Sequence, residues 1–259
     1  DFSEIDDQAL KTFVNVVLSP LNNWSDDFIK FKIAAYPNRL YFGKIEHGKI
    51  DIINLDFYNL YSEIDRNTME ERDVDFTRRL IVKRILFYTG KPVEHFFDTT
   101  KEDISFYYDL LFKVSMNVPR IIGYILSYCF QNHIIFDKPI NKSALESAAE
   151  KYFETVVESF FSETTYSLIA INEKISILQL KDLLNSFIGN MISIKRKINA
   201  GELTGEAYDK RNPHVSHFYV SPSHEDLLKT LELSFFISKY NQMSDRDSIE
   251  SSIYCLNYG

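Results

Sequence analysis

Glycine and proline are scarce in this sequence, at 8 and 7 of 259 residues. Because turns between short strands draw on these residues, their scarcity argues against an all-β fold and favours long helices. Cysteine is rarer still, and Cys129 and Cys255 lie too far apart for a metal or redox motif. This usage fits a reducing, cytoplasmic compartment, with Cys129 as a buried thiol inside an apolar helical run.

The sequence also has no apolar run of membrane-spanning length and no signal peptide, so we expect no membrane partner. The formal net charge is −8, which argues against a general polyanion-binding surface but is compatible with a local basic patch. The 21 Phe and 16 Tyr are enough for a substantial packed core. The chain opens on DFSEIDDQAL, without methionine, and we interpret it as a fragment, a processed chain or a truncated product.

The first part of the chain alternates in character. Apolar residues from Ala9 to Leu18 recur at helical spacing, which predicts a helix that ends at Ser19-Pro20. FIKFKIAAY, residues 28–36, predicts a buried strand, and PNR a turn. LYFGKI and IDIINLDFY predict two more short strands, separated by the turn EHGK.

From about Thr68 to residue 162 the pattern is helical and predicts four helices packed as a small bundle. Gly90 predicts the end of the first helix, Pro119 the start of the third, and Asn141 the N-cap of the fourth. A long amphipathic helix is expected at 175–198, and the polar stretch AGELTGEAYDKRNPH reads as a flexible connection. HFYVS then predicts a strand, SPSHEDLLKTLELSFFISKY a helix running into a strand, MSDRDS a turn, and SIESSIYCLNY a closing strand.

Asn117-Val118-Pro119-Arg120 joins two apolar helices of the bundle. Proline suits the first helical turn, but Arg120 follows it where the helix dipole is already positive. A cation there calls for a neighbouring anion. The candidates are a nucleotide phosphate or a carboxylate such as Glu102, Asp103 or an acid of the preceding helix.

Four stretches together resemble the C-terminal half of AAA+ ATPases, closest to the origin-recognition and signal-transduction branch. DFSE at the start is similar to the end of a Walker B strand, and FKIAAYPNR to the strand that ends at the sensor 1 position. NVPRIIGYIL resembles the sensor 2 motif, and LELSFFISKYNQMSDRDSIESSIYCLNYG a winged helix. The resemblance covers the whole chain, but the sequence contains no Gly-x-x-x-x-Gly-Lys-Ser/Thr loop to hold phosphates.

The resemblance implies a mainly α (α+β) chain in three parts. These are a partial α/β ATPase core (1–66), a four-helix lid bundle with sensor 2 (67–162), and a long helix with a C-terminal winged helix (163–259). In the intact protein, ATP and Mg²⁺ would bind between a missing P-loop half and the lid, and hydrolysis would switch the lid and winged-helix positions. For this chain alone we expect no cofactor and no metal site.

The resemblance also implies roles for four residues. Asp1 would be an acid of the magnesium site, or else a polar terminus; Asn38 would be sensor 1, or else a turn asparagine. Arg39 would be a finger acting in trans, or else a solvated turn residue. Arg120 would contact the γ-phosphate as sensor 2.

A basic concentration precedes the expected wing, at Lys195, Arg196, Lys197, Lys210 and Arg211. Such residues bind nucleic-acid phosphates or a partner, but Ser223 to Gly259 carries more acids than bases and favours protein docking. His214, His217 and His224 lie close enough in sequence to suggest an adventitious metal site, but a solvated loop explains them better.

Three functions therefore remain open. The first is the lid and C-terminal part of an AAA+-type ATPase, inactive alone, whose winged helix docks a partner. The second is a non-catalytic interaction module that uses the same parts for self-association or protein binding. The third is a winged-helix regulator that binds DNA, which the charge balance disfavours.

Overall fold

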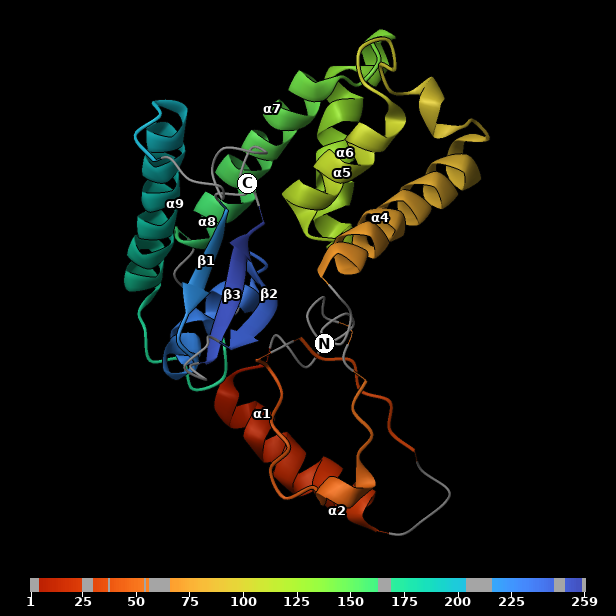
Figure 1. Cartoon of the computed structure of the whole chain (residues 1–259). Coiled ribbons are helices and arrows are strands. Elements are labelled where there is room, and N and C mark those ends of the chain that lie inside the picture. Colours follow the sequence, from red (N-terminus) through yellow and green to blue (C-terminus); the bar gives the residue numbers. More distant parts are fainter. Residues whose placement is uncertain are drawn as a thin grey trace.

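The computed structural model describes residues 5–24, 30–36, 38–53, 55, 66–162, 169–203, 216–244 and 250–257, with the side chains of 66–70 left aside. These residues form a mainly helical molecule with one three-stranded antiparallel sheet (Figure 1). The mainly α class predicted from the scarcity of glycine and proline is confirmed. Asp1, Lys210, Arg211, the expected turn after Ser244 and most of the expected flexible connection lie outside the described residues.

The N-terminal helix extends further than its sequence predicts. α1 (Asp7–Phe13) passes through a π-helical turn, η2 (Val14–Leu18), into α2 (Ser19–Asn23). The expected end at Ser19-Pro20 is therefore wrong. The N–H of Ser19 bonds back to the carbonyl of Val14, and Pro20 lies in the first turn of α2, where its missing donor costs nothing.

The strands expected in the first 66 residues are also wrong wherever the structure describes them. Residues 30–36 are irregular and mostly exposed, 40–46 contain a turn, and 47–49 form a 3₁₀ turn, η3 (His47–Lys49). The backbone of this region bonds to asparagine side chains of the N-terminal helices instead of to a neighbouring strand. Asn15 Oδ1 accepts from Lys44 N at 3.2 Å, and Asn23 bonds both Lys44 O and Glu46 N, at 2.9 and 3.1 Å.

The four helices between 66 and 160 follow the prediction. They are α4 (Arg66–Thr89), α5 (Ile104–Ser115), α6 (Pro119–Asn132), and a last helix made of α7 (Lys142–Tyr152), the π turn η6 (Phe153–Val157) and α8 (Glu158–Phe160). Gly90 ends α4 at φ +66°, and Asn141 caps α7 by accepting from Ala144 N at 2.9 Å. Short 3₁₀ turns, η4 (Val93–His95) and η5 (Ile134–Phe136), lie in the connections.

The C-terminal part follows the prediction in its order of elements, but the single helix expected ahead of the last two strands is a 3₁₀ helix and a short α-helix. α9 (Ile177–Asn199) begins with a capping box between Ser176 and Gln179. It is followed by β1 (His217–Val220), η7 (Pro222–Leu228), α11 (Lys229–Leu233), β2 (Ile237–Ser244) and β3 (Glu250–Leu256). The strand order is β1-β3-β2, with β3 central and antiparallel to both neighbours.

One hydrophobic core runs from the helices into the sheet. Leu145 of the bundle, Leu180 of α9, Leu231 of α11 and Tyr254 of β3 all belong to it. A second cluster joins the end of α5, through Phe112 and Met116, to Tyr240, Ile253 and Cys255 of the sheet.

The N-terminal helices have a small cluster of their own. It consists of Leu10, Val14 and Leu18, with Tyr41, Ile45 and Ile171 against them. In Figure 1 these helices lie below the sheet, while the bundle lies above it.

A candidate phosphate-contact site at the start of α6

The turn between α5 and α6 has an uncommon backbone. Met116 and Asn117 both adopt left-handed conformations, with φ of 45° and 61°. The Asn117 side chain accepts a hydrogen bond from Thr77 Oγ1 and donates one to Asp73 Oδ1 at 3.3 Å. Asp73 and Thr77 are fully buried on α4. Asparagine tolerates this left-handed conformation better than most residues do. The hydrogen bonds of its side chain to α4 hold the turn in place.

Arg120 follows this turn in the first turn of α6, immediately after Pro119. Its side chain is exposed, and Nη2 donates to Tyr36 Oη at 3.0 Å. The N-cap residue, Val118, provides no side-chain hydrogen bond to the first-turn amides. A guanidinium and an uncapped helix N-terminus thus lie together, and both favour an anion.

Two of the carboxylates that the sequence offered as partners for Arg120 have other partners. Asp103 caps α5, accepting from Ile104 N at 2.8 Å and from Ser105 Oγ at 2.9 Å. Asp109 pairs with Lys113 at 2.6 Å. Across the described ranges, no carboxylate lies within ion-pair distance of Arg120.

Tyr36 connects Arg120 to the segment that the sequence related to sensor 1. Its ring packs edge-on against Phe235, with centroids 6.0 Å apart. Two residues later, Asn38 has φ 61° and donates from Nδ2 to Glu232 Oε2 at 3.0 Å and to the Lys229 carbonyl at 3.3 Å. The structure therefore brings Tyr36 to Arg120, whereas the Asn38 side chain is engaged with α11.

Arg39 is buried, in contrast to a solvated turn residue. Its guanidinium donates to Asp7 Oδ1 at 2.6 Å, to the Ile169 carbonyl at 3.2 Å and to the Ile5 carbonyl. A finger acting on a neighbouring subunit needs an exposed guanidinium, and this side chain is only 5% exposed. In this conformation Arg39 joins the N-terminal helix to residue 169, and its role in trans stays a prediction.

The segment Ile169–Glu173 continues that junction toward the sheet. Asn172 N donates to Asp7 Oδ2 at 3.0 Å, and Ile171 N to the Asn38 carbonyl at 3.0 Å. On its other side, Ala170 N donates to Thr230 Oγ1 at 3.0 Å. Short polar contacts therefore connect α1 to α11.

Lys195, Arg196 and Lys197 lie exposed near the end of α9. Cations are favoured at a helix C-terminus by the dipole, which explains their position without a ligand. The structure does not bring them to Arg120: α9 lies at one side of the molecule, with α7 and α8 between it and α6 in the view of Figure 1.

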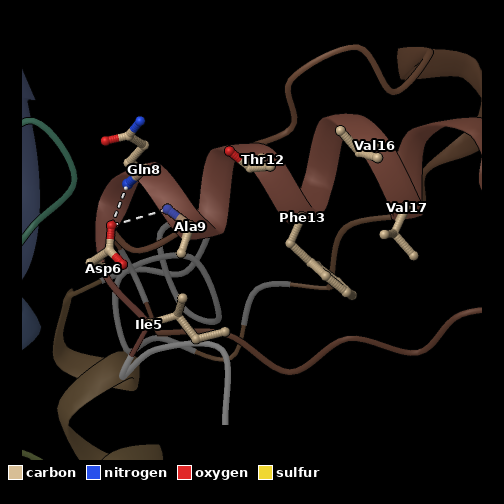
Figure 2. Close-up of a pocket in the computed structure, with 8 residues that line it drawn as sticks. All are labelled: Ile5, Asp6, Gln8, Ala9, Thr12, Phe13, Val16 and Val17. Atoms are coloured by element: carbon tan, nitrogen blue, oxygen red, sulfur yellow. Dashed lines mark hydrogen bonds between the residues drawn. The ribbon is translucent and has the colours of Figure 1, made fainter.

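An apolar groove runs along the N-terminal helix. Figure 2 shows Gln8, Thr12 and Val16 in one row along the helix, with Phe13 and Val17 below them. Val16 is 67% exposed and Val17 38% exposed, so both present apolar surface along the groove. Asp6 caps the helix at the groove's end, accepting from Gln8 N and Ala9 N.

Within the ranges that the structure describes, no group of three His, Cys, Asp or Glu side chains is placed to hold a metal ion. His214 lies outside those ranges, His217 faces the ring of Tyr240, and His224 contacts Ser223. Cys129 and Cys255 are free and buried, and burial raises the pKa of each thiol to about 12. The described helices include none that is both long and apolar enough to cross a membrane.

Comparison with protein-family models, curated proteins and solved structures gives no match for this chain. The resemblance to AAA+ ATPases therefore stays a prediction from the sequence.

Sequence reasoning missed the residues that support Arg120. Tyr36 carries no signal, because its contact joins residues 84 positions apart. Asp73 and Thr77, in contrast, carry a signal in the sequence. They are polar residues at i and i+4 ahead of buried Ile81, which places them on the core face of α4.

Proposed function

We propose that this chain is the lid and winged-helix part of an AAA+-type ATPase, in which Arg120 contacts a nucleotide phosphate. The observation that carries the proposal is the exposure of Arg120 and the set of groups around its guanidinium. It is an exposed guanidinium at an uncapped helix N-terminus, and no carboxylate pairs with it among the described residues. Among the described residues, the acceptor for its guanidinium is the Tyr36 hydroxyl, and a phosphate oxygen is a stronger acceptor.

The chain's own residues would act by positioning. Asn117, held by Asp73 and Thr77, fixes the turn that aims Arg120. Tyr36 holds the guanidinium in one direction at 3.0 Å. These groups are suited to bind a phosphate. Magnesium would be bound by other residues, such as Asp1. ATP would supply the charged group that Arg120 recognises.

The C-terminal part supports the winged-helix assignment. The order helix, strand, two short helices and a hairpin, with strands paired as β1-β3-β2, is the one expected of a winged helix. α11 takes the place of a recognition helix, but it has only five residues and is contacted by Asn38 and by Ala170. This arrangement favours docking inside the molecule or with a protein partner over reading of duplex DNA through α11.

The groove along α1 fits the same proposal. An ATPase half that packed against Val16, Val17 and Phe13 would cover an apolar surface that is otherwise exposed to water. The two buried cysteine thiols are consistent with a reducing, cytoplasmic setting.

The test is a titration with a fluorescent ATP analogue in the presence of Mg²⁺. It uses the 259-residue chain and a version extended by any residues that the gene encodes ahead of Asp1. We expect binding by the extended version, and a loss of about 10- to 100-fold for Arg120→Ala, since hydrogen bonds to charged groups contribute roughly 1.5–3 kcal/mol. Arg72→Ala, an exposed arginine on α4, is the matched control and should bind like the unmodified protein.

Two results would remove the proposal. One is an extended version that binds no ATP, and the other is equal ATP affinity with and without the Arg120 side chain. In either case the second candidate, a non-catalytic interaction module, would replace it. Self-association of the 259-residue chain, measured by sedimentation, would then be expected to depend on Val16 and Val17.

A further inference from the structure

The second half of α4 is strongly basic in an acidic protein. Residues 76–93 contain no Asp or Glu, but they contain Arg78, Arg79, Lys83, Arg84 and Lys91, in a chain of net charge −8. The sign of the local charge is therefore opposite to that of the molecule as a whole. Such segregation indicates a surface for an anionic ligand.

Few of these charges are neutralised within the described structure. Asp75 is shared by Arg78 at 2.5 Å and Arg79 at 2.8 Å. Lys83 and Arg84 are exposed, and no ion pair or hydrogen bond engages them in the part of the chain that the structure describes. Lys91 Nζ lies 2.8 Å from His95 Nε2, which is not a carboxylate.

Two aromatic rings project beside these cations. Phe87 is 80% exposed and Tyr88 79% exposed, with their ring centroids 5.0 Å apart and their planes at 89°. Lys83 and Arg84 lie four residues earlier, so each cation is the helical neighbour of one ring. We call Lys83, Arg84, Phe87, Tyr88 and Lys91 the α4 patch.

We propose that the α4 patch binds single-stranded nucleic acid. Cations spaced along a helix track a phosphate backbone, and exposed rings stack on bases that a duplex would keep buried. The surface is independent of Arg120 and of the proposed ATPase. Figure 1 shows the end of α4 at the outer edge of the molecule, away from the sheet and from α9.

A membrane surface fits less well. Leu86, Phe87 and Tyr88 are consecutive, so on a helix they point in directions about 100° apart. A helix that lies in a bilayer interface needs its apolar residues along one face and its cations on the opposite one. Here the cations and rings alternate along the same turns.

The experiment measures binding of a fluorescein-labelled 20-nucleotide oligo(dT) by anisotropy, between 50 and 200 mM salt, with oligo(U) and a duplex of equal length beside it. Three available cations, Lys83, Arg84 and Lys91, predict a slope of log K against log[salt] of about −2, because single strands give about −0.7 per phosphate contact. Lys83→Ala/Arg84→Ala should flatten the slope by about 1.4. Phe87→Ala should weaken binding about tenfold, and Phe87→Tyr should restore it.

Two matched controls separate the α4 patch from general effects. Lys142→Ala/Lys151→Ala removes the same charge from α7, and Phe130→Ala removes a ring that is 53% exposed on α6. Both should bind the oligonucleotides like the unmodified protein. All substituted residues are exposed, and a circular-dichroism melt checks that each variant is folded.

Four results would overturn the proposal. They are no binding of either single strand at 50 mM salt, binding unchanged by the α4-patch variants, duplex binding tighter than single-strand binding, and equal affinity for poly-glutamate. Binding of phosphatidylserine vesicles without binding of oligonucleotides would likewise assign the patch to a membrane surface. Loss of self-association in Lys83→Ala/Arg84→Ala, with no oligonucleotide binding by the unmodified chain, would assign it to a second copy of the protein.

Discussion

Replacing Arg39 by alanine should loosen the docking of the N-terminal helices without unfolding the bundle. The guanidinium joins Asp7, the Ile5 carbonyl and the Ile169 carbonyl, and it is one of the few buried charges in the described structure. A buried ion pair that loses one partner costs about 3–5 kcal/mol, and an exposed pair about 0–1. Asp7 is 34% exposed, so its carboxylate can regain water. We therefore expect a loss of about 3 kcal/mol in the local stability of this junction.

Hydrogen exchange followed by mass spectrometry measures that loss segment by segment. Exchange of the amides in Asp7–Asn23 should accelerate on the order of 100-fold in Arg39→Ala, since 1.4 kcal/mol is a factor of ten. Exchange in Pro119–Asn132 should stay the same, because that helix belongs to a different core cluster. Arg39→Lys keeps the charge but not the planar guanidinium, so its exchange rates in Asp7–Asn23 should lie between those of the unmodified protein and those of Arg39→Ala.

Lys113→Ala is the control. Its ion pair with Asp109 has the same 2.6 Å length but is exposed, so exchange should change less than about fivefold. An Arg39→Ala variant with unchanged exchange in the N-terminal helices would refute the structural role. It would also return Arg39 to the finger role that its sequence context suggests.

Three further predictions concern the turn, a cap and the thiols. Asn117→Ala should lower the free energy of unfolding in urea by about 2–4 kcal/mol, since it removes the hydrogen bonds to buried Asp73 and Thr77 and leaves at φ 61° an alanine, which adopts this left-handed conformation less readily than asparagine. Asn117→Gly should cost less, because glycine has no β-carbon; equal losses would show that backbone strain is unimportant. Ser176→Ala should lower the free energy of unfolding by about 1 kcal/mol, because it removes the capping box of α9. Ser186→Ala is the control and should lower it less in the same assay, because the Ser186 hydroxyl only donates to the Asp182 carbonyl of its own helix. Burial raises the pKa of Cys129 and Cys255 to about 12, so both thiols stay protonated in the folded state, whereas unfolded thiols ionise near 9. The free energy of unfolding should therefore fall as pH rises from about 9 to 12, and it should fall less in Cys129→Ala/Cys255→Ala. Fast labelling of the native protein by a thiol reagent at pH 8 would contradict the burial of these thiols.

The helical part was predictable because its signals are local. Gly90, Pro119 and Asn141 end, start and cap helices through contacts with their own neighbours in sequence, and the structure confirms each of them. The β2–β3 hairpin was predictable for a similar reason, since the two strands follow one another along the chain. The pairing of β1 with β3 was not, because the two strands are separated by β2 along the chain. Apolar spacing and short-range chemistry carry this information.

The N-terminal part was not predictable from the same signals. Alternating apolar residues from 28 to 53 indicate strands, but in its described residues this region bonds to Asn15, Asn22 and Asn23 of the helices before it. Apolar alternation alone does not reveal whether a partner strand is available. The π turn that lets the helix continue through Pro20 likewise leaves no mark in the sequence.

For the candidate site, the sequence identified Arg120 and the turn of residues 117–120 that contains it. It did not identify Tyr36, because a hydroxyl 84 positions away is a tertiary contact with no local pattern. It offered both a chemical role and a plain turn role for Asn38 and Arg39, whereas the structure engages their side chains with Glu232 and Asp7. Polar residues at turns serve both purposes, and only the fold distinguishes them.

The most direct test of the central claim is the ratio of the dissociation constants for ADP and ATP, measured by calorimetry on the version extended ahead of Asp1. If Arg120 contacts the terminal phosphate, the unmodified protein should prefer ATP, and Arg120→Ala should reduce that preference by about tenfold or more. Tyr36→Phe should keep the preference, because the guanidinium remains. An ADP-to-ATP ratio that is the same with and without the Arg120 side chain would contradict the claim.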